Sequence, residues 1–233
     1  MHDAGISPSS KEGNQILYRA VIYGKPDAVR DLLTAGVPTS GESKPKGAVE
    51  MWTPSGSLLE DAAYYRDDSN SRKEVIALLL DSPAVKSNRQ DLQRALSKAA
   101  AEGQLDVAHM LIAAGADPQT FFQDTNSGDE KPADQTYLMR TVESGVWAMI
   151  DDALSRPHDI HAVDHDGRSA LAMVIWTSPP VEDIFPIVDK LLAASAGKRE
   201  LDRALAYACD RPDWRDGLIA RGANAKICTD QKK

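Results

Sequence analysis

The feature that most constrains the fold is an irregular internal repeat. Six leucines recur in similar surroundings, at intervals of 42, 37, 42, 33 and 34 residues: Leu17, Leu59, Leu96, Leu138, Leu171 and Leu205. The clearest copy, "AAAEGQLDVAHMLIAAGADP" from Ala99, has a small residue, then a glycine, an apolar pair and a second glycine; the copy from Ala20 follows the same order. A period of this length predicts a stack of similar units, because no copy can bury both its faces alone.

Each copy predicts two short helices joined by a tight turn. In the clearest copy, apolar residues from Val107 to Ala114 have helical spacing, and Gly103 separates them from the preceding helix. Gly115 is expected to end the second helix in the left-handed conformation. In three other copies a hydroxyl residue stands where a first helix should be capped, namely at Ser57, Thr136 and Ser169.

These copies resemble the ankyrin repeat, whose pattern is roughly T-P-L-H-x-A-A-x-x-G and then L-L-x-x-G-A-D. The best matches are residues 115–118, 222–224 and 164–171. The resemblance implies an all-α ankyrin-repeat solenoid of about six helix-turn-helix units with long finger loops. The T-P-L-H tetrad is never intact, because its histidine position holds Tyr18, Glu60, Ser97, Met139, Ala172 and Ala206. The hydrogen bonds that the tetrad makes between repeats are therefore expected to be weaker.

The expected organisation is a single ankyrin-repeat domain over residues 13–227, between a disordered tail at 1–12 and a second tail at 228–233. The units are expected near 13–37, 54–85, 89–118, 135–162, 163–195 and 199–226. Intervals longer than the family period of about 33 residues indicate two long finger loops, at 36–57 and 116–136. Long loops in compact domains are usually functional or disordered.

The charge narrows the classes of partner. Lys plus Arg is 27 and Asp plus Glu is 35, so the formal net charge is −8. General nucleic-acid binding needs a basic face, whereas an acidic chain suits a basic protein partner. No apolar run reaches the roughly 18 residues of a membrane helix, so no membrane association is expected. The polar start, "MHDAGISPSSKEG", is unlike a signal peptide; we expect a cytoplasmic protein, or a periplasmic one if a signal has been removed.

The two cysteines, Cys209 and Cys228, are too isolated for a zinc framework. We expect two free thiols in a reducing compartment, with Cys209 packed in the core. One disulfide between them is the alternative if the protein is exported.

The stretch "HDIHAVDHDG", residues 158–167, holds three of the five histidines and raises the question of a metal site. Pro157 before it and the closing Asp-Gly favour a turn instead, in which Asp164 and Asp166 bond to their own backbone. A partner contact is the second alternative and a metal site the third. Phosphate loops, nucleophile elbows and zinc-protease motifs are absent from the sequence. We therefore expect no enzyme activity, no catalytic residues, no cofactor and no metal.

Partner binding is expected on the concave face of the repeat stack. In the repeat frame, the residues that point into this groove combine aromatic rings with carboxylates: Tyr23, Tyr64, Tyr65, Glu102, Glu143, Trp176 and Asp210. The fingers add Trp52, Phe121, Phe122, His161 and His165. Tyrosine and tryptophan dominate interface hot spots, although the alternative is that the rings pack beneath the fingers. If the histidine turn contacts a partner, binding should change near pH 6.

Irregular repeats of this kind are similar to single bacterial ankyrin-repeat proteins. The resemblance implies a non-catalytic protein-binding module, monomeric when free. Such proteins commonly serve as immunity proteins that neutralise a cognate secreted toxin, and an acidic groove would suit a basic toxin domain such as a nuclease. Two alternatives stay open: a periplasmic protein that supports an envelope or stress-response enzyme, and a secreted host-directed effector or scaffold.

Overall fold

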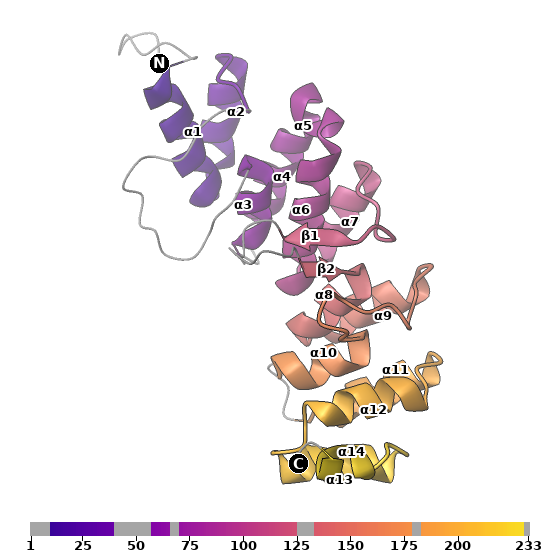
Figure 1. The fold of residues 1–233 in the computed structure, drawn as a ribbon. Helices are drawn as coiled ribbons and strands as arrows, with labels where there is room; N and C mark the ends of the chain where they lie inside the picture. Colours follow the sequence, from indigo (N-terminus) through magenta and orange to yellow (C-terminus); the bar gives the residue numbers. More distant parts are fainter. Residues whose placement is uncertain (1–9, 40–56, 66–69, 125–132, 179–182, 231–233) are drawn as a thin grey trace. The chain divides into compact units, whose positions relative to one another are not determined.

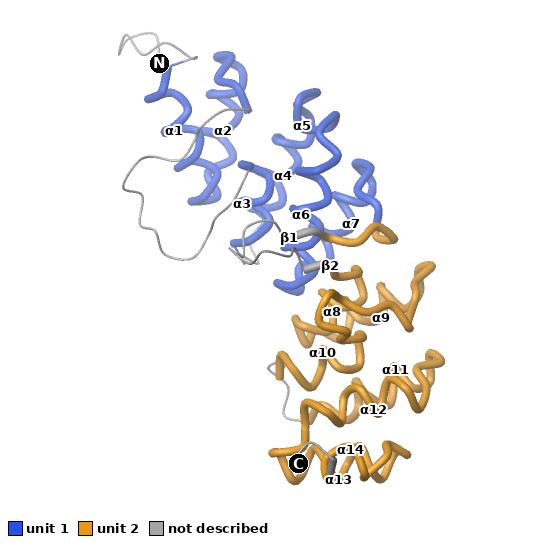
Figure 2. Tube along the Cα trace, viewed as in Figure 1, with its two compact units in different colours: residues 1–117 blue, residues 118–233 orange. Residues whose placement is uncertain are grey.

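The computed structural model describes residues 10–39, 57–65, 70–124, 133–178 and 183–230 of the 233-residue chain (Figure 1). The described residues are predominantly helical, as expected. The chain divides into two compact units, residues 1–117 and 118–233 (Figure 2).

Unit 1 contains two rows of helices. An inner row consists of α1 (Lys11–Ile22), α3 (Leu58–Tyr64) and α6 (Arg89–Ala101), packed side by side. An outer row consists of α2 (Pro26–Thr34), α4 (Asn70–Asp81) and α7 (Leu105–Ala113). The short helix α5 (Pro83–Ser87), which was not expected, joins α4 to α6. The repeat leucines Leu17, Leu59 and Leu96 are buried in the core.

Unit 2 repeats this arrangement. Its inner row is α8 (Tyr137–Ser144), α10 (Ala170–Thr177), α12 (Lys198–Ala206) and α14 (Lys226–Asp230). The helices α9 (Trp147–Ser155), α11 (Phe185–Ala193) and α13 (Pro212–Ala220) pack on α8, α10 and α12 respectively. Leu138, Leu171 and Leu205 are buried. The spacing of the repeat leucines therefore predicted the inner helices of both units except α14.

The predicted helix starts are confirmed. The Ser57 hydroxyl accepts a hydrogen bond from the Glu60 N–H at 3.2 Å, and Thr136 accepts one from Met139 at 3.2 Å. Ser169 caps α10 in the same way. These hydroxyls satisfy N–H groups of the first turn, which have no partner within the helix.

The predicted turn glycines are confirmed too. Gly103 has φ 73° between α6 and α7, and Gly115 has φ 108° after α7. Beyond Gly115, the Ala116 N–H donates to the Leu111 carbonyl at 3.0 Å. This bond closes the helix as a left-handed terminal residue allows.

Three segments differ from the expected loops and tails. The finger at 116–136 contains an antiparallel pair of strands, β1 (Phe122–Asp124) and β2 (Ala133–Gln135). The helix α1 begins at Lys11, inside the expected N-terminal tail, because the Ser10 hydroxyl caps it by accepting from Gly13 at 3.0 Å. The helix α14 extends to Asp230, inside the expected C-terminal tail. Among the described helices, none has the length and apolar character needed to cross a bilayer.

Candidate functional site

In unit 1, the predicted binding residues lie where the inner helices end. Tyr23 follows α1 and is 71% exposed. Tyr64 and Tyr65 lie at the end of α3, with their rings edge to face at 5.5 Å between centroids. Both are half-buried, and the Arg72 guanidinium lies 5.8 Å from the Tyr65 ring centroid. Tyr23 is thus available for a partner, whereas Tyr65 also packs against its neighbours.

Arg72 links α4 to the end of α1. Its buried guanidinium donates to the Val21 carbonyl at 2.6 Å and to the Ile22 carbonyl at 2.8 Å. Gln104 does the same for α3, donating to the Ala63 carbonyl at 2.7 Å. Carbonyls at a helix C-terminus have no partner within the helix. A side chain from the following repeat therefore completes the end at which the candidate residues lie.

A half-buried tyrosine, Tyr18, lies close to Asp61 and Tyr65. Burial, reinforced by the negative charge of Asp61 and by Tyr65, raises the pKa of Tyr18 to about 12. Nothing in the sequence pattern indicated that Tyr18 would lie beside the candidate binding residues. Its hydroxyl stays protonated over the physiological range.

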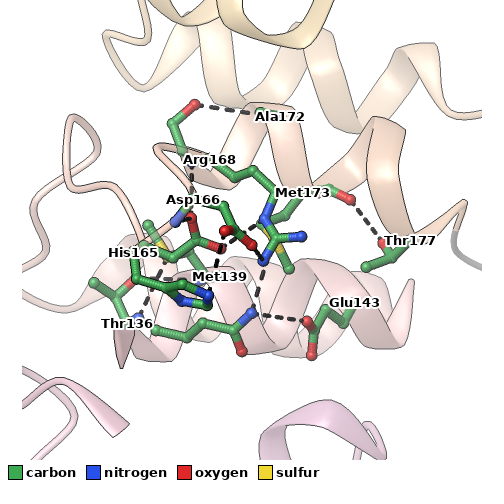
Figure 3. Close-up of polar contacts among 12 residues, drawn as sticks. Thr136, Met139, Glu143, His165, Asp166, Arg168, Ala172, Met173 and Thr177 are labelled. Carbon is green, nitrogen blue, oxygen red and sulfur yellow. Dashed lines mark hydrogen bonds and ion pairs between the residues drawn. The ribbon is translucent and has the colours of Figure 1, made fainter. Parts of the chain in front are cut away.

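In unit 2, Trp176 is the central exposed residue, with 54% of its surface accessible. Its ring meets Tyr207 edge to face at 5.7 Å, and the Arg168 guanidinium carbon lies 4.9 Å from its centroid. Arg168 is itself buried and pairs at 2.7 Å with both Asp164 and Asp166 (Figure 3). The tryptophan is therefore supported by a fixed cation and a second ring, and still presents much of its surface to solvent.

The predicted groove residues Glu143, Trp176 and Asp210 make up the candidate strip of unit 2. Its two carboxylates are not equivalent. Glu143 is half-buried and accepts from Arg140 at 3.0 Å and from the Gln135 amide at 3.3 Å. Asp210 is exposed. Asp210 can thus meet a partner without breaking the internal contacts that hold Glu143.

Arg211, next to Asp210, adds positive charge to the strip. Its guanidinium donates to the Ile175 carbonyl at 3.2 Å and to the Ser178 hydroxyl at 2.9 Å, and lies 4.3 Å from the Trp214 ring centroid. It completes the end of α10 as Arg72 completes the end of α1. The strip around Trp176 therefore carries arginines as well as carboxylates.

The finger candidates separate into exposed and buried residues. Phe121 is 44% exposed, whereas Phe122 is only 3% exposed on β1, opposite Gln135. The prediction of Phe122 as a contact residue is wrong, because successive side chains of a strand point to opposite faces. Trp52 lies outside the described residues, and Glu102 is half-buried at the end of α6.

A cavity of about 310 Å³ borders Phe121 and is also lined by Tyr137 and Arg156. The Tyr137 hydroxyl donates to Asp152 at 3.0 Å, and Asp152 pairs with Arg156 at 2.8 and 2.9 Å. Burial, followed by the charge of Asp152, raises the pKa of Tyr137. The polar groups of Tyr137 and Arg156, which line the cavity, therefore both find a hydrogen-bond partner in Asp152.

The histidine stretch, residues 158–167, forms turns, as the sequence predicts. One oxygen of Asp164 accepts from the Asp166 N–H at 3.0 Å and from the Arg168 N–H at 2.8 Å. Asp166 differs from the expectation: its carboxylate pairs with the Arg168 guanidinium and with the His165 ring nitrogen, at 2.7 and 3.3 Å. The turn therefore holds Arg168 beneath Trp176.

The other two histidines bond within unit 2. His161 Nδ1 lies 3.1 Å from a carboxylate oxygen of Glu200, a buried residue of α12. The other Glu200 oxygen accepts from the Gly197 N–H at 2.9 Å. Burial alone would raise the pKa of Glu200, but the bonds from Gly197 and His161 outweigh it and lower this pKa. His158 Nδ1 lies 2.7 Å from the Arg156 carbonyl oxygen.

The turn also brings potential metal ligands together. Ligand atoms of Asp164, His165 and Asp166 lie within 4.8 Å of one another. Both carboxylates, however, already pair with Arg168. A metal cation would have to displace this guanidinium, so the cluster is best described as the support of Trp176.

The cysteines form a disulfide, Cys209–Cys228, so the expectation of two free thiols is wrong. Packing of α14 against α12 brings the two Cα atoms to 5.2 Å, although they are 19 residues apart in sequence. Cys209 is half-buried rather than packed in the core. This pairing depends on how α14 folds back, which no local pattern specifies.

No protein-family model matches the chain, and no curated protein matches it. The site therefore stands on its own geometry. The sequence pattern did not indicate that Arg168 and Tyr207 would support the Trp176 ring, or that Arg72 would support the Tyr65 ring. Their sequence separation from those rings gives no signal that they would be in contact.

Proposed function

We propose that this chain is a divergent ankyrin-repeat protein and a non-catalytic protein-binding module. In this proposal, its physiological role is that of a bacterial immunity protein that binds and neutralises a basic toxin domain. The observation that carries the binding function is Trp176, which is more than half exposed while Arg168 and Tyr207 hold its ring. An aromatic side chain ordered before binding loses little freedom when a partner covers it.

Three further observations support a protein partner, two of them a partner that is basic. Tyr23 is a second largely exposed aromatic residue at the end of an inner helix. The net charge of −8 favours encounter with a positively charged surface. Asp210 places one exposed carboxylate on the same strip as Trp176.

The test is binding to the protein encoded next to this chain's gene, together with affinity capture from the source organism. Trp176→Ala should weaken binding by at least about tenfold, with a loss of stability no larger than that of Trp147→Ala, since each ring makes a cation–π contact. Trp147→Ala is the matched control, because Trp147 is 41% exposed but lies on the outer helix α9. If the wild-type protein retains no partner at micromolar concentration, the proposal fails. It also fails if the two variants weaken binding equally.

A second candidate is a periplasmic protein that supports an envelope or stress-response enzyme. The Cys209–Cys228 disulfide favours it, because disulfides persist mainly in oxidising compartments. A secreted effector or scaffold shares this support. Fractionation of the source cells, with free thiols blocked at lysis, tests the compartment: an oxidised chain in the periplasm favours the second candidate, and a reduced cytoplasmic chain removes it.

A further inference from the structure

The disulfide holds a very short helix against the last inner helix. α14 spans Lys226–Asp230, and isolated helices of this length are unstable in water. Cys228 is 8% exposed, and its sulfur is bonded to Cys209 just beyond the end of α12. Ile227 faces a hollow that α12 lines. The Thr229 hydroxyl donates to the Lys226 carbonyl at 2.8 Å, which is a bond within α14 itself.

Contacts with other elements hold α12 in place independently of α14. Leu201 and Leu205 are buried, and α12 packs against α10 and α13. Glu200 bonds to His161 and to its own helix start, at Gly197. Loss of α14 would therefore leave α12 in place.

We propose that Cys209–Cys228 is a reversible redox site, and that its reduction by a protein dithiol releases α14 from α12. Cys209 is the point of attack, because it is half-buried whereas Cys228 is buried. This inference does not depend on the proposed partner, since it concerns only the last two inner helices.

The exchange is balanced in two steps. A thiolate of the reductant attacks the Cys209 sulfur, and Cys228 leaves as a thiolate that takes up a proton. The second thiol of the reductant, after losing its proton, attacks the reductant's sulfur in the mixed disulfide, and Cys209 leaves as a thiolate and is protonated. The reductant's two thiols are oxidised to a disulfide while this chain gains two thiols.

Release of α14 would change the surface at the end of the inner row. The hollow beside α14, about 660 Å³, is lined by Lys198, Arg199, Asp202, Arg203, Ala206 and Ile227. Ile227 is the only one of these residues that α14 supplies. The reduced form therefore presents a more open, cation-rich flank of α12.

Hydrogen exchange on the full chain tests the release. After reduction with dithiothreitol, amides of 226–230 should exchange at least about tenfold faster, while those of 201–205 keep their protection. Reoxidation should restore the first segment. A Cys209→Ser, Cys228→Ser double variant should match the reduced protein and no longer respond to dithiothreitol. Unchanged exchange in 226–230 would overturn the proposal, as would loss of protection throughout unit 2, which would make the bond a general stabiliser.

The point of attack has its own test. Brief treatment of the full chain with reduced glutathione, followed by acid trapping and peptide mass spectrometry, should find the mixed disulfide on Cys209. Glutathione found mainly on Cys228 would overturn the assigned direction.

Discussion

Arg221, the residue that follows α13, lies over the ring of Phe185 on α11, with 4.3 Å between the guanidinium carbon and the ring centroid. The same guanidinium pairs with Asp189, one helical turn after Phe185, at 2.5 and 2.8 Å. A ring and a carboxylate spaced by four residues thus hold one cation of the next outer helix. Contacts of this kind join consecutive repeats on the side away from the candidate binding residues.

Lys190 makes the corresponding contacts one repeat earlier. Its ammonium lies 5.7 Å from the centroid of the Trp147 ring and forms an ion pair with Asp151, four residues after Trp147 on α9. The arrangement therefore occurs twice in unit 2. Cation–π contacts are directional and partly shielded from water, so they contribute more than an isolated surface ion pair.

Replacement of Arg221 by alanine should lower the free energy of unfolding by about 1–2 kcal/mol, because both the ring contact and the ion pair are lost. Urea denaturation followed by circular dichroism measures the change. Arg215→Ala is the control, since Arg215 pairs with its sequence neighbour Asp216 and should contribute far less. Equal effects of the two substitutions would show that the ring contact adds nothing.

Gly217 should be a position where alanine destabilises a helix. In an exposed helix interior, glycine to alanine stabilises by about 1 kcal/mol. A Cβ at Gly217 on α13 would instead overlap the ring of Phe185. We expect Gly217→Ala to lower the free energy of unfolding by about 1–3 kcal/mol. In a Phe185→Ala background the same substitution should become stabilising; a stabilising effect in the wild-type background would contradict the close packing.

Acidification should reveal the contribution of Glu200. Its pKa is lowered in the folded chain from an ordinary value of 4.5. Its contribution is therefore complete above pH 4.5 and is lost as the pH falls through the lower folded-state pKa. Urea titrations at pH 7 and pH 3 should show wild type more stable than Glu200→Gln, by a margin that shrinks at pH 3. His161→Ala should reduce this pH dependence in part, and a constant margin would refute the assignment.

Arg168 should contribute to the stability of the folded chain. Arg168→Ala leaves the buried Asp164 without its charged partner, and we expect a loss of about 3 kcal/mol. Arg168→Lys keeps the charge, but a single ammonium cannot reproduce the forked contacts to Asp164 and Asp166, so it should recover only part of the loss. Chemical denaturation measures both variants. Full recovery by lysine would show that charge alone suffices.

Local signals predicted the helix starts and turns because each depends on a few neighbouring residues. A hydroxyl at Ser57 can reach the third N–H of its own helix, and Gly115 adopts a positive φ that side chains disfavour. The exposure of Tyr23 and Trp176 also follows the repeat pattern. The strands at 122–124 and 133–135 were missed, because short pairings in a long loop leave no clear alternation.

The sequence by itself determined the order of the paired helices, several of their caps and turns, and the repeat leucines of the core, since these follow from propensity and periodicity over short spans. Tertiary packing decided which side chains meet across repeats. It buried Phe122, placed Arg168 beneath Trp176, and brought Cys209 to Cys228. These contacts join residues that are well separated along the chain, and their distances depend on how neighbouring elements pack, which a repeat pattern alone does not specify.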